Sequence, residues 1–248
     1  MKTNIYHIGY TQAIKEVSIF FWGCNFKCKG CLCHKEIRNY LLKENLHLFN
    51  EEPKGIAPFP DKFLDVDEVA QALEGLDFNR VLLEGQEASL DPAYPLLTET
   101  LHKKFGSRNI LCTNAYKIPS LEHTDELQIG LKAFTDRVHR DYTGKSNKKV
   151  LDNFTSLYRS GRKLTVSSIF IPEYIDAEET ERIAEFLASL DKNIPYHILA
   201  YFKAGDSPWR RPTHDEIDQA ASLARKHLNR VWGWRGDEEV MHAMKRIF

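Results

Sequence analysis

The chain lacks several features that would assign it to a large class of proteins. No uninterrupted apolar stretch approaches the roughly 18 residues that a membrane-spanning helix needs. The first residues, Met1 to Asn4, do not open a basic-then-apolar leader. A formal net charge of −1 gives no excess of positive charge for binding nucleic acid, and there is no internal repeat or low-complexity tract. We therefore expect a cytoplasmic protein without a membrane or nucleic-acid partner.

Cysteine is scarce as well, but its distribution is uneven. Only five cysteines occur in 248 residues. Three of them, Cys24, Cys28 and Cys31, form a C-x3-C-x2-C pattern directly after the apolar run 17–22. Thiolates suit iron–sulfur clusters, and a four-iron cluster held by three of them keeps one iron free for a substrate or cofactor. The spacing predicts a three-ligand iron–sulfur site at the end of a strand.

Two other interpretations of these cysteines are open. A zinc ion could take the three thiolates and a fourth ligand from Cys33 or His34. A disulfide framework is the other, but a reducing compartment and the crowded spacing favour metal ligation over cross-linking. Cys33 and Cys112 lie outside the three-ligand pattern, and we expect Cys33 to be a buried, inert thiol.

The pattern of apolar residues predicts an α/β fold. With 42% hydrophobic residues, the chain can bury a full core as one barrel-like domain over residues 1–248. Short apolar runs alternate with segments of helical period, which is typical of parallel strands joined by crossover helices. Strands are predicted at residues 17–23, 80–84, 109–114, 126–132, 164–172 and 196–202.

Helices are predicted between these strands, at residues 65–76, 92–105, 146–160, 177–190 and 213–228. Asp65, Ser146, Asp176 and Thr213 can each cap the helix that follows. We also expect a short strand at 230–234 and a terminal helix from Asp237. Residues 39–61 form an irregular insertion with several prolines, either a lid or docking loop or a surface excursion with a short helix over 40–48.

The segment from Cys24 to Cys31, CNFKCKGC, resembles the cluster-binding loop of radical S-adenosylmethionine enzymes. Further matches follow in the same order over most of the chain. They are most similar to the activating enzymes of glycyl radical enzymes, typified by pyruvate formate-lyase activating enzyme. The resemblance implies a partial (β/α)6 barrel with parallel strands, a [4Fe-4S] cluster bound by Cys24, Cys28 and Cys31, and S-adenosylmethionine as the second cofactor.

The resemblance also implies a site for adenosylmethionine at the ends of the strands. Leu83 to Glu87 is similar to the family's Gly-Gly-Glu segment, Cys112 to Asn114 to its Asp-Thr-Asn-Gly, and Ile194 to His197 to its Leu-Pro-Tyr-His. The lysine of the family's Asp-Leu-Lys segment matches Lys132. The implied cofactor-binding residues are Gly85, Gln86, Glu87, Thr113, Lys132 and His197, and Glu87 is the candidate for the amino group of the cofactor.

Five positions depart from the family pattern. Gln86 replaces the second glycine, Gly130 and Cys112 stand where the family has aspartates, Gly30 replaces an aromatic residue, and Ser167 lies where the activases carry arginine. Losing two carboxylates weakens the case for a cation site beside the cofactor and for the detailed activase assignment. The cluster and the general cofactor site do not depend on them.

The first functional hypothesis is therefore reductive cleavage of adenosylmethionine to a 5′-deoxyadenosyl radical that removes hydrogen from a glycine of a glycyl radical enzyme. No ferredoxin-like second cysteine set is present, so an external donor such as flavodoxin or ferredoxin is implied. One alternative is the same chemistry on a small molecule or modified nucleotide, with residues 39–61 closing over it. A non-catalytic iron–sulfur protein is the other. We expect Trp209, Trp232 and Trp234 to pack the open edge of the barrel.

Overall fold

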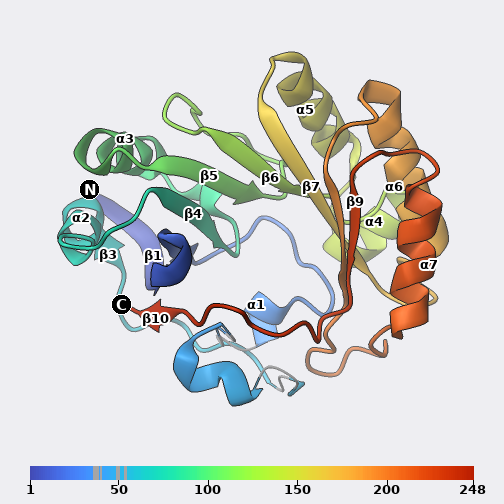
Figure 1. Ribbon diagram of the computed structural model, residues 1–248, viewed down its shortest axis with the longest axis horizontal. Helices are drawn as coiled ribbons and strands as arrows, with labels where there is room; N and C mark the ends of the chain where they lie inside the picture. Colours follow the sequence, from blue (N-terminus) through green and yellow to red (C-terminus); the bar gives the residue numbers. More distant parts are fainter. Residues whose placement is uncertain (36–38, 40, 49–50, 53–54) are drawn as a thin grey trace.

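A curved, open sheet forms the centre of the molecule in this computed structural model (Figure 1). The structure describes residues 1–35, 39, 41–48, 51–52 and 55–248. The strand order is β10-β1-β2-β4-β5-β6-β7-β8-β9, with β3 beside β1. The strands are β1 Lys2–Thr11, β2 Glu16–Phe21, β3 Leu64–Asp65, β4 Arg80–Gly85, β5 Arg108–Thr113, β6 Glu126–Gly130, β7 Lys163–Phe170, β8 Tyr196–Ala200, β9 Val231–Trp234 and β10 Lys245–Arg246.

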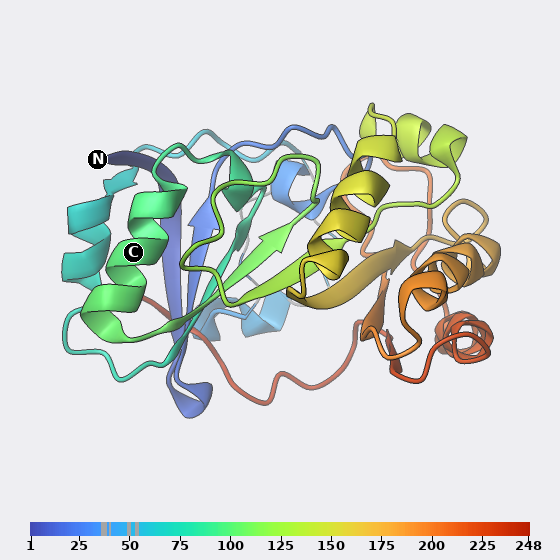
Figure 2. The same ribbon diagram turned by 90° about the horizontal axis from the view of Figure 1, so that it is seen from above.

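Strands β2 and β4 to β9 run parallel to one another, and most of the helices cover the outer face of the sheet (Figures 1 and 2). The α-helices are α1 Leu32–Lys35, α2 Val66–Ala72, α3 Tyr94–Phe105, α4 Asp136–Thr143, α5 Lys148–Arg159, α6 Ala177–Leu190 and α7 His214–Ala224. The 3-10 helices are η1 Gln12–Ile14, η2 Lys43–Leu48 and η3 Ala88–Leu90. This arrangement confirms the expected α/β fold with an open, mostly parallel sheet.

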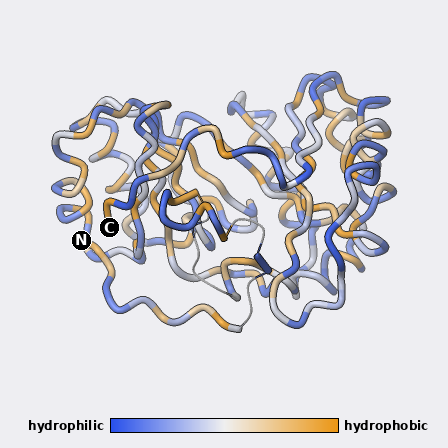
Figure 3. Tube along the Cα trace, turned by 60° about the horizontal axis from the view of Figure 1, so that its bottom comes forward, coloured by the Kyte–Doolittle hydropathy of each residue, from blue (hydrophilic) through white to orange (hydrophobic). Residues whose placement is uncertain are grey.

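The predicted elements reappear with small shifts at their ends. The six predicted strands are β2 and β4 to β8, the short strand at 230–234 is β9, and the five predicted helices are α2, α3, α5, α6 and α7. Asp65, Asp176 and Thr213 accept hydrogen bonds from amides of the first turns of their helices, and Ser146 accepts one from Lys148. Hydrophobic and hydrophilic positions alternate along the helices in Figure 3, as burial of one face requires.

Among the described elements longer than six residues, β1 and α4 were not predicted from the sequence. Strand β1 pairs antiparallel with β2, and its buried polar residues bond to residues far away in the sequence. The Thr3 hydroxyl donates to the Leu64 carbonyl at 2.6 Å, and His7 bonds to the Phe248 carbonyl. Helix α4 is short and mostly charged, with only His139, Tyr142 and Thr143 buried. In both elements, contacts with remote parts of the chain replace the local apolar pattern.

The prediction of a terminal helix from Asp237 is wrong. This segment instead crosses the open side of the sheet from β9 to the opposite edge, where β10 pairs with β1 (Figure 1). Met244 is 3% exposed, and a Cβ atom added at Gly9 would lie 1.9 Å from the Met244 sulfur. Pairing with β1 and this close packing therefore override the helical spacing of the apolar residues.

The irregular insertion at 39–61 contains η2, which covers part of the short helix expected over 40–48, although Tyr40 lies outside the described residues. Leu42 in this insertion is buried and forms a parallel bridge with Met244. The insertion and the C-terminal segment thus lie against each other. Throughout the described part of the chain, no helix has the length and apolar character needed to cross a membrane.

Candidate active site

A cavity of about 500 Å3 lies at the carboxyl ends of the parallel strands. Active sites of barrels built from parallel strands gather at this end, because the loops that follow the strands converge there. Every parallel strand of the sheet contributes through its last residues or the loop after it. Lining residues include Cys24, Cys28, Cys31, Gly85, Gln86, Glu87, Thr113, Asn114, Gln128, Lys132, Ser167, Leu199, Tyr201, Phe202 and Trp234.

The three cysteines of the C-x3-C-x2-C pattern all line this cavity from the loop after β2. All five cysteines of the chain are free thiols, so the disulfide interpretation is not realised. Within the described residues, no three thiol, imidazole or carboxyl groups converge closely enough for a single metal ion.

Burial controls the ionisation of these thiols in the metal-free protein. It raises the pKa of Cys24, and it raises that of Cys28 to about 12. A hydrogen bond from the Cys33 thiol lowers the pKa of Cys31, and the same bond together with burial raises that of Cys33. Because only thiolates bind metals, loading the site must release protons from Cys24 and Cys28.

Gly30 in this loop has a specific packing role. It has a φ of +71°, and an added Cβ would lie 2.6 Å from the Tyr201 hydroxyl oxygen and 2.9 Å from Ser207 Oγ. A side chain larger than hydrogen is therefore excluded by both backbone conformation and space. Tyr201 fills the space beside this position, where the family pattern has an aromatic residue within the loop itself.

Gly85 and Gln86 hold the ends of the cysteine loop. Gly85 has a φ of +105°, and an added Cβ would meet the Phe21 nitrogen at 2.8 Å. The Gln86 side chain accepts a hydrogen bond from Gly23 N–H at 3.0 Å and donates one to the Cys33 carbonyl at 3.4 Å. The glutamine that departs from the family's second glycine thus bridges the start and the end of the loop.

Glu87 is 3% exposed and its carboxylate is fully engaged with the protein. One oxygen accepts from Ser89 Oγ at 2.5 Å and Thr113 Oγ1 at 2.6 Å, and the other accepts from Asn114 N–H at 2.8 Å. Burial raises the pKa of Glu87, while these hydrogen bonds oppose the shift. Glu87 caps η3 and joins the ends of β4 and β5; its contact with adenosylmethionine stays a prediction.

Lys132 lines the cavity, as do Gly130 and Cys112, the two residues that stand where the family has aspartates. A Cβ atom added at Gly130 would lie 3.1 Å from Lys132 Nζ, and none of the ion pairs among the described residues involves this lysine. Cys112 lines the cavity, and its thiol donates to Gln128 Oε1 at 3.5 Å. Burial raises the pKa of Cys112 well above its usual value, so the thiol is neutral.

His197 does not lie where the resemblance to Leu-Pro-Tyr-His implies. It is the second residue of β8, is not among the described residues lining the cavity, and accepts a hydrogen bond from Trp234 Nε1 at 2.9 Å. Its ring stacks on Trp232 at 4.8 Å. Tyr201 and Phe202, which follow β8, line the cavity instead. A contact of His197 with adenosylmethionine stays a prediction.

Comparison with known protein families identifies the enzyme class to which the chain belongs. A family model described as the radical SAM superfamily matches residues 18–187, which include the cysteine loop and the ends of β4 to β7. The chain belongs to the radical SAM superfamily. The cofactors of this enzyme class are a [4Fe-4S] cluster and S-adenosylmethionine, and the chain is a radical SAM enzyme.

Relatives of this radical SAM enzyme include activating enzymes. A Methanocaldococcus jannaschii protein with the provisional name glycyl-radical enzyme activating enzyme is 30% identical over 90% of this chain and 82% of its own. An isethionate sulfite-lyase activating enzyme from Oleidesulfovibrio alaskensis is 26% identical over 75% of this chain, which spans 58% of that protein.

Solved structures share the fold of this radical SAM enzyme. A domain of pyruvate-formate lyase-activating enzyme from Bacteroides vulgatus covers 62% of this chain and 98% of its own, with a TM-score of 0.53 and 18% identity. QueE from Escherichia coli covers 93% of both chains, with a TM-score of 0.57 and 15% identity. Both similarities support a partial barrel built on an open sheet.

A second cavity of about 660 Å3 adjoins the first in this radical SAM enzyme. The two share Leu32, Cys33, Glu84, Phe202 and Gly236 as walls. The second extends to the insertion and to the C-terminal strand, and its walls also include Tyr6, His7, Phe20, Asn39, Leu41, Leu42, Pro60, Asp61, Lys62, Arg246 and Phe248. The two cavities thus lie side by side, from the cysteine loop to the C-terminal strand.

Glu84 stands between the two cavities and was not singled out from the sequence. Burial raises the pKa of its carboxyl to about 7, opposed by a hydrogen bond from Ser18. Glu84 directly follows the apolar strand residues Val81-Leu82-Leu83, and this position is the signal that could have identified it. Buried ionisable groups are rare without a partner or a function.

Proposed function

We propose that this radical SAM enzyme activates a glycyl radical enzyme by removing a hydrogen atom from one of its glycines. The observation that carries the proposal is the pair of adjoining cavities, which share Glu84 and Phe202 as walls and together extend from the cysteine loop to the C-terminal strand. A glycine in a folded partner can reach the cofactors only as part of a chain loop, which needs such an extended space. The relatives named as activating enzymes support the same assignment.

The chain's own residues bind and position the cofactors in this proposal. Cys24, Cys28 and Cys31 would hold the cluster, and Gln86 fixes the ends of their loop. Gly85, Thr113 and Lys132 line the cavity, and in this proposal the backbone at Gly85, the Thr113 hydroxyl and Lys132 would contact adenosylmethionine. When bound, the cluster supplies the electron that splits adenosylmethionine into methionine and a 5′-deoxyadenosyl radical, which takes the hydrogen atom. That electron comes from an external donor such as flavodoxin or ferredoxin.

The deciding experiment follows the hydrogen atom. The glycyl radical enzymes of the source organism are prepared with glycine deuterated at the α-carbon and mixed anaerobically with the reconstituted enzyme, adenosylmethionine and reductant. We expect deuterium in the 5′-deoxyadenosine by mass spectrometry and an organic radical signal in the partner. Cleavage that never carries deuterium from any partner would contradict the glycine assignment while leaving the radical SAM chemistry intact.

Substitution of single cysteines tests the ligand assignment. We expect Cys24→Ala, Cys28→Ala and Cys31→Ala each to abolish binding of an intact four-iron cluster, measured as iron and sulfide per chain after reconstitution. Cys33→Ala and Cys112→Ala are the matched controls and should retain full iron content. A Cys33 variant that alone loses the cluster would show that the ligand set is misassigned.

A small molecule or modified nucleotide is the second candidate substrate. The rings of His197, Trp232 and Trp234 lie nearly parallel, and Trp234 lines the cavity. Trp232 and Trp234 are 40% and 42% exposed, so the packing role expected for them is incomplete. Exposed aromatic faces bind planar ring systems by stacking. Tight binding of nucleosides, seen as quenching of tryptophan fluorescence that Trp234→Ala removes, would favour this candidate.

A further inference from the structure

Helix α4 contacts the cysteine loop on both sides of Cys28. Lys27 N–H donates to the Thr143 carbonyl at 2.9 Å, and Lys29 N–H donates to the Tyr142 carbonyl at 2.9 Å. Tyr142 and Thr143 are the last residues of α4, where carbonyls have no partner within the helix. The loop therefore satisfies two free carbonyls of the helix, and the helix fixes the backbone immediately before and after Cys28.

Side chains of the same two segments add two further contacts. The Phe26 and His139 rings meet edge to face, with centroids 5.4 Å apart and planes at 84°. Lys29 Nζ donates to Asp141 Oδ1 at 2.7 Å. Residues 26–29 are thus held along their whole length by residues 139–143. The ion pair is half-exposed and contributes little by itself, so the buried contacts must dominate.

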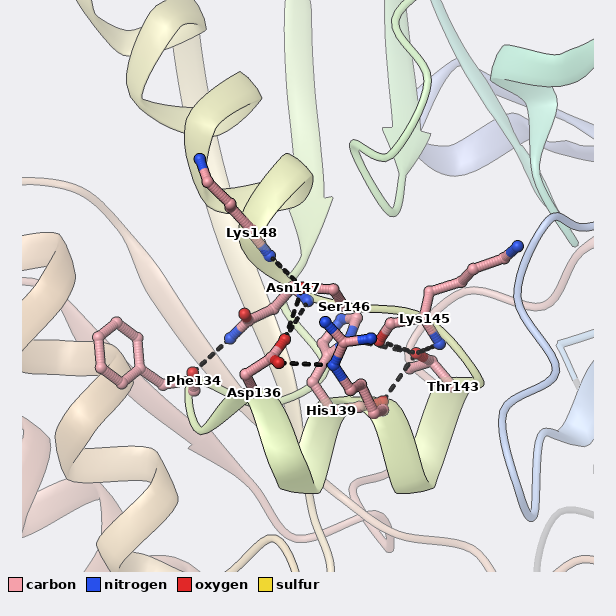
Figure 4. A network of polar contacts seen from close by, with 9 residues as sticks. Phe134, Asp136, His139, Thr143, Lys145, Ser146, Asn147 and Lys148 are labelled. Carbon is pink, nitrogen blue, oxygen red and sulfur yellow. Dashed lines mark hydrogen bonds and ion pairs between the residues drawn. The ribbon is translucent and has the colours of Figure 1, made fainter.

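The end of α4 is held in turn by a buried network around His139 and Thr143 (Figure 4). His139 Nδ1 bonds to the Lys145 carbonyl at 2.7 Å, which requires the hydrogen on Nδ1. Thr143 Oγ1 donates to the His139 carbonyl at 2.7 Å and accepts from Lys145 N–H at 3.1 Å. Both side chains are 1% exposed. They join the last turn of α4 to the chain that leaves it.

Nδ1 is the only ring nitrogen of His139 that has polar partners among the described residues, the Lys145 carbonyl and Thr143 Oγ1. The His139 Nε2 is buried and has no hydrogen-bond partner within the described residues. The ring is consequently fixed by Nδ1 on one side and by Phe26 on the other. If the ring served for packing alone, a phenylalanine would replace it without loss, because a buried unpaired nitrogen destabilises the fold.

We propose that α4 is a positioning element for the cluster-binding loop, and that His139 and Thr143 are positioning residues that hold the Tyr142 and Thr143 carbonyls in place for the amides flanking Cys28. The proposal rests on the role of Cys28 as a cluster ligand. Groups that orient metal ligands commonly change metal affinity by about 10–100-fold when they are removed. The expected consequence of loosening this clamp is therefore faster loss of iron, without loss of the fold.

Four variants separate the hydrogen bond from packing. His139→Phe keeps a ring against Phe26 and removes the donor, whereas His139→Asn places an amide N–H near the position of Nδ1. Thr143→Val removes the hydroxyl with little change of shape. Thr98→Val is the matched control, because Thr98 is equally buried and its hydroxyl donates to the carbonyl four residues back, at Tyr94, on the remote helix α3.

The measurement is the rate of iron release from the anaerobically reconstituted protein to an excess of a colorimetric ferrous chelator. We expect His139→Phe and Thr143→Val to release iron about tenfold faster than wild type. His139→Asn should rescue most of the difference, and Thr98→Val should release iron at the wild-type rate. Equal rates for Thr143→Val, Thr98→Val and wild type would overturn the proposal.

A second measurement covers the case in which His139→Phe does not fold. Hydrogen exchange in the metal-free protein should be faster across residues 26–31 in Thr143→Val than in Thr98→Val. Unchanged exchange there would refute the clamp. Neither readout involves a glycine substrate, so failure of the proposed function would leave both expectations standing. Full iron content in Cys28→Ala would instead show that the ligand assignment has failed.

Discussion

Two carboxyl groups three positions apart, Glu84 and Glu87, take different parts in the site. Burial raises the pKa of both. Hydrogen bonds from Ser89, Thr113 and Asn114 compensate for the burial of the Glu87 carboxylate. Glu87 is therefore part of the framework that joins β4 to β5. Glu84 receives a bond from Ser18 and faces both cavities. The pKa of Glu84, about 7, lies near neutral pH.

Glu84→Gln should make the stability of the protein less dependent on pH. A carboxyl whose pKa is about 7 in the fold and about 4.5 when unfolded stabilises the fold below pH 4.5. That contribution is lost as the pH rises through 7. We therefore expect the free energy of unfolding of the variant, relative to wild type, to increase between pH 5 and pH 8, by at most about 3 kcal/mol. Urea titrations of the metal-free proteins at the two pH values measure it, and a difference that is constant with pH contradicts the assignment.

Single residues were predictable where their chemistry is local. The three cysteines were found from spacing alone, because a ligand set carried on one loop is visible in sequence. Gly30 was noted only as a departure, since its reason is Tyr201, some 170 positions away. The sequence match at His197 gave no sign that Tyr201 and Phe202, and not His197, line the cavity. Contacts between distant segments, such as Gln86 with Gly23 and Cys33, have no signal in a single sequence.

At the scale of secondary structure, the outcome depended on whether an element is stabilised locally or by its neighbours. Helix α6 was predicted with its observed ends, because a capping aspartate precedes a clear apolar stripe. Helix α4 was missed because its buried residues serve the cysteine loop. The C-terminal segment has the spacing of a helix, but its backbone finds partners in β1 and in the insertion.

Met244 anchors this C-terminal segment, and its truncation should measure how firmly the segment is attached. Met244 is buried against Gly9, whereas Met241 in the same segment is 75% exposed. We expect Met244→Ala to lower the free energy of unfolding by about 2–5 kcal/mol. Met241→Ala, the control, should change it by less than about 0.5 kcal/mol. Equal effects in chemical denaturation would mean that the segment does not pack on β1 as described.

At the scale of the whole molecule, the core and the cofactor site are largely separate. One buried hydrophobic cluster runs from Ile5 on β1 to Val231 on β9, and Cys24 and Cys28 pack only against its margin. The sheet therefore has its own source of stability, as its size and apolar content led us to expect. Phe26 ties the cysteine loop to this core, and the loop is also held by Gln86 at its ends and by α4 in its middle.

Removal of the cluster should consequently leave the fold intact. We expect anaerobic chelation to leave the far-ultraviolet circular dichroism unchanged and to lower the melting temperature by about 5–10 °C, because a ligand that binds only the folded state contributes a few kcal/mol. In small metal-dependent domains the opposite holds, since the metal supplies most of the folding free energy. Loss of the helical and strand signals on chelation would show that the cluster, and not the apolar core between β1 and β9, holds this sheet together.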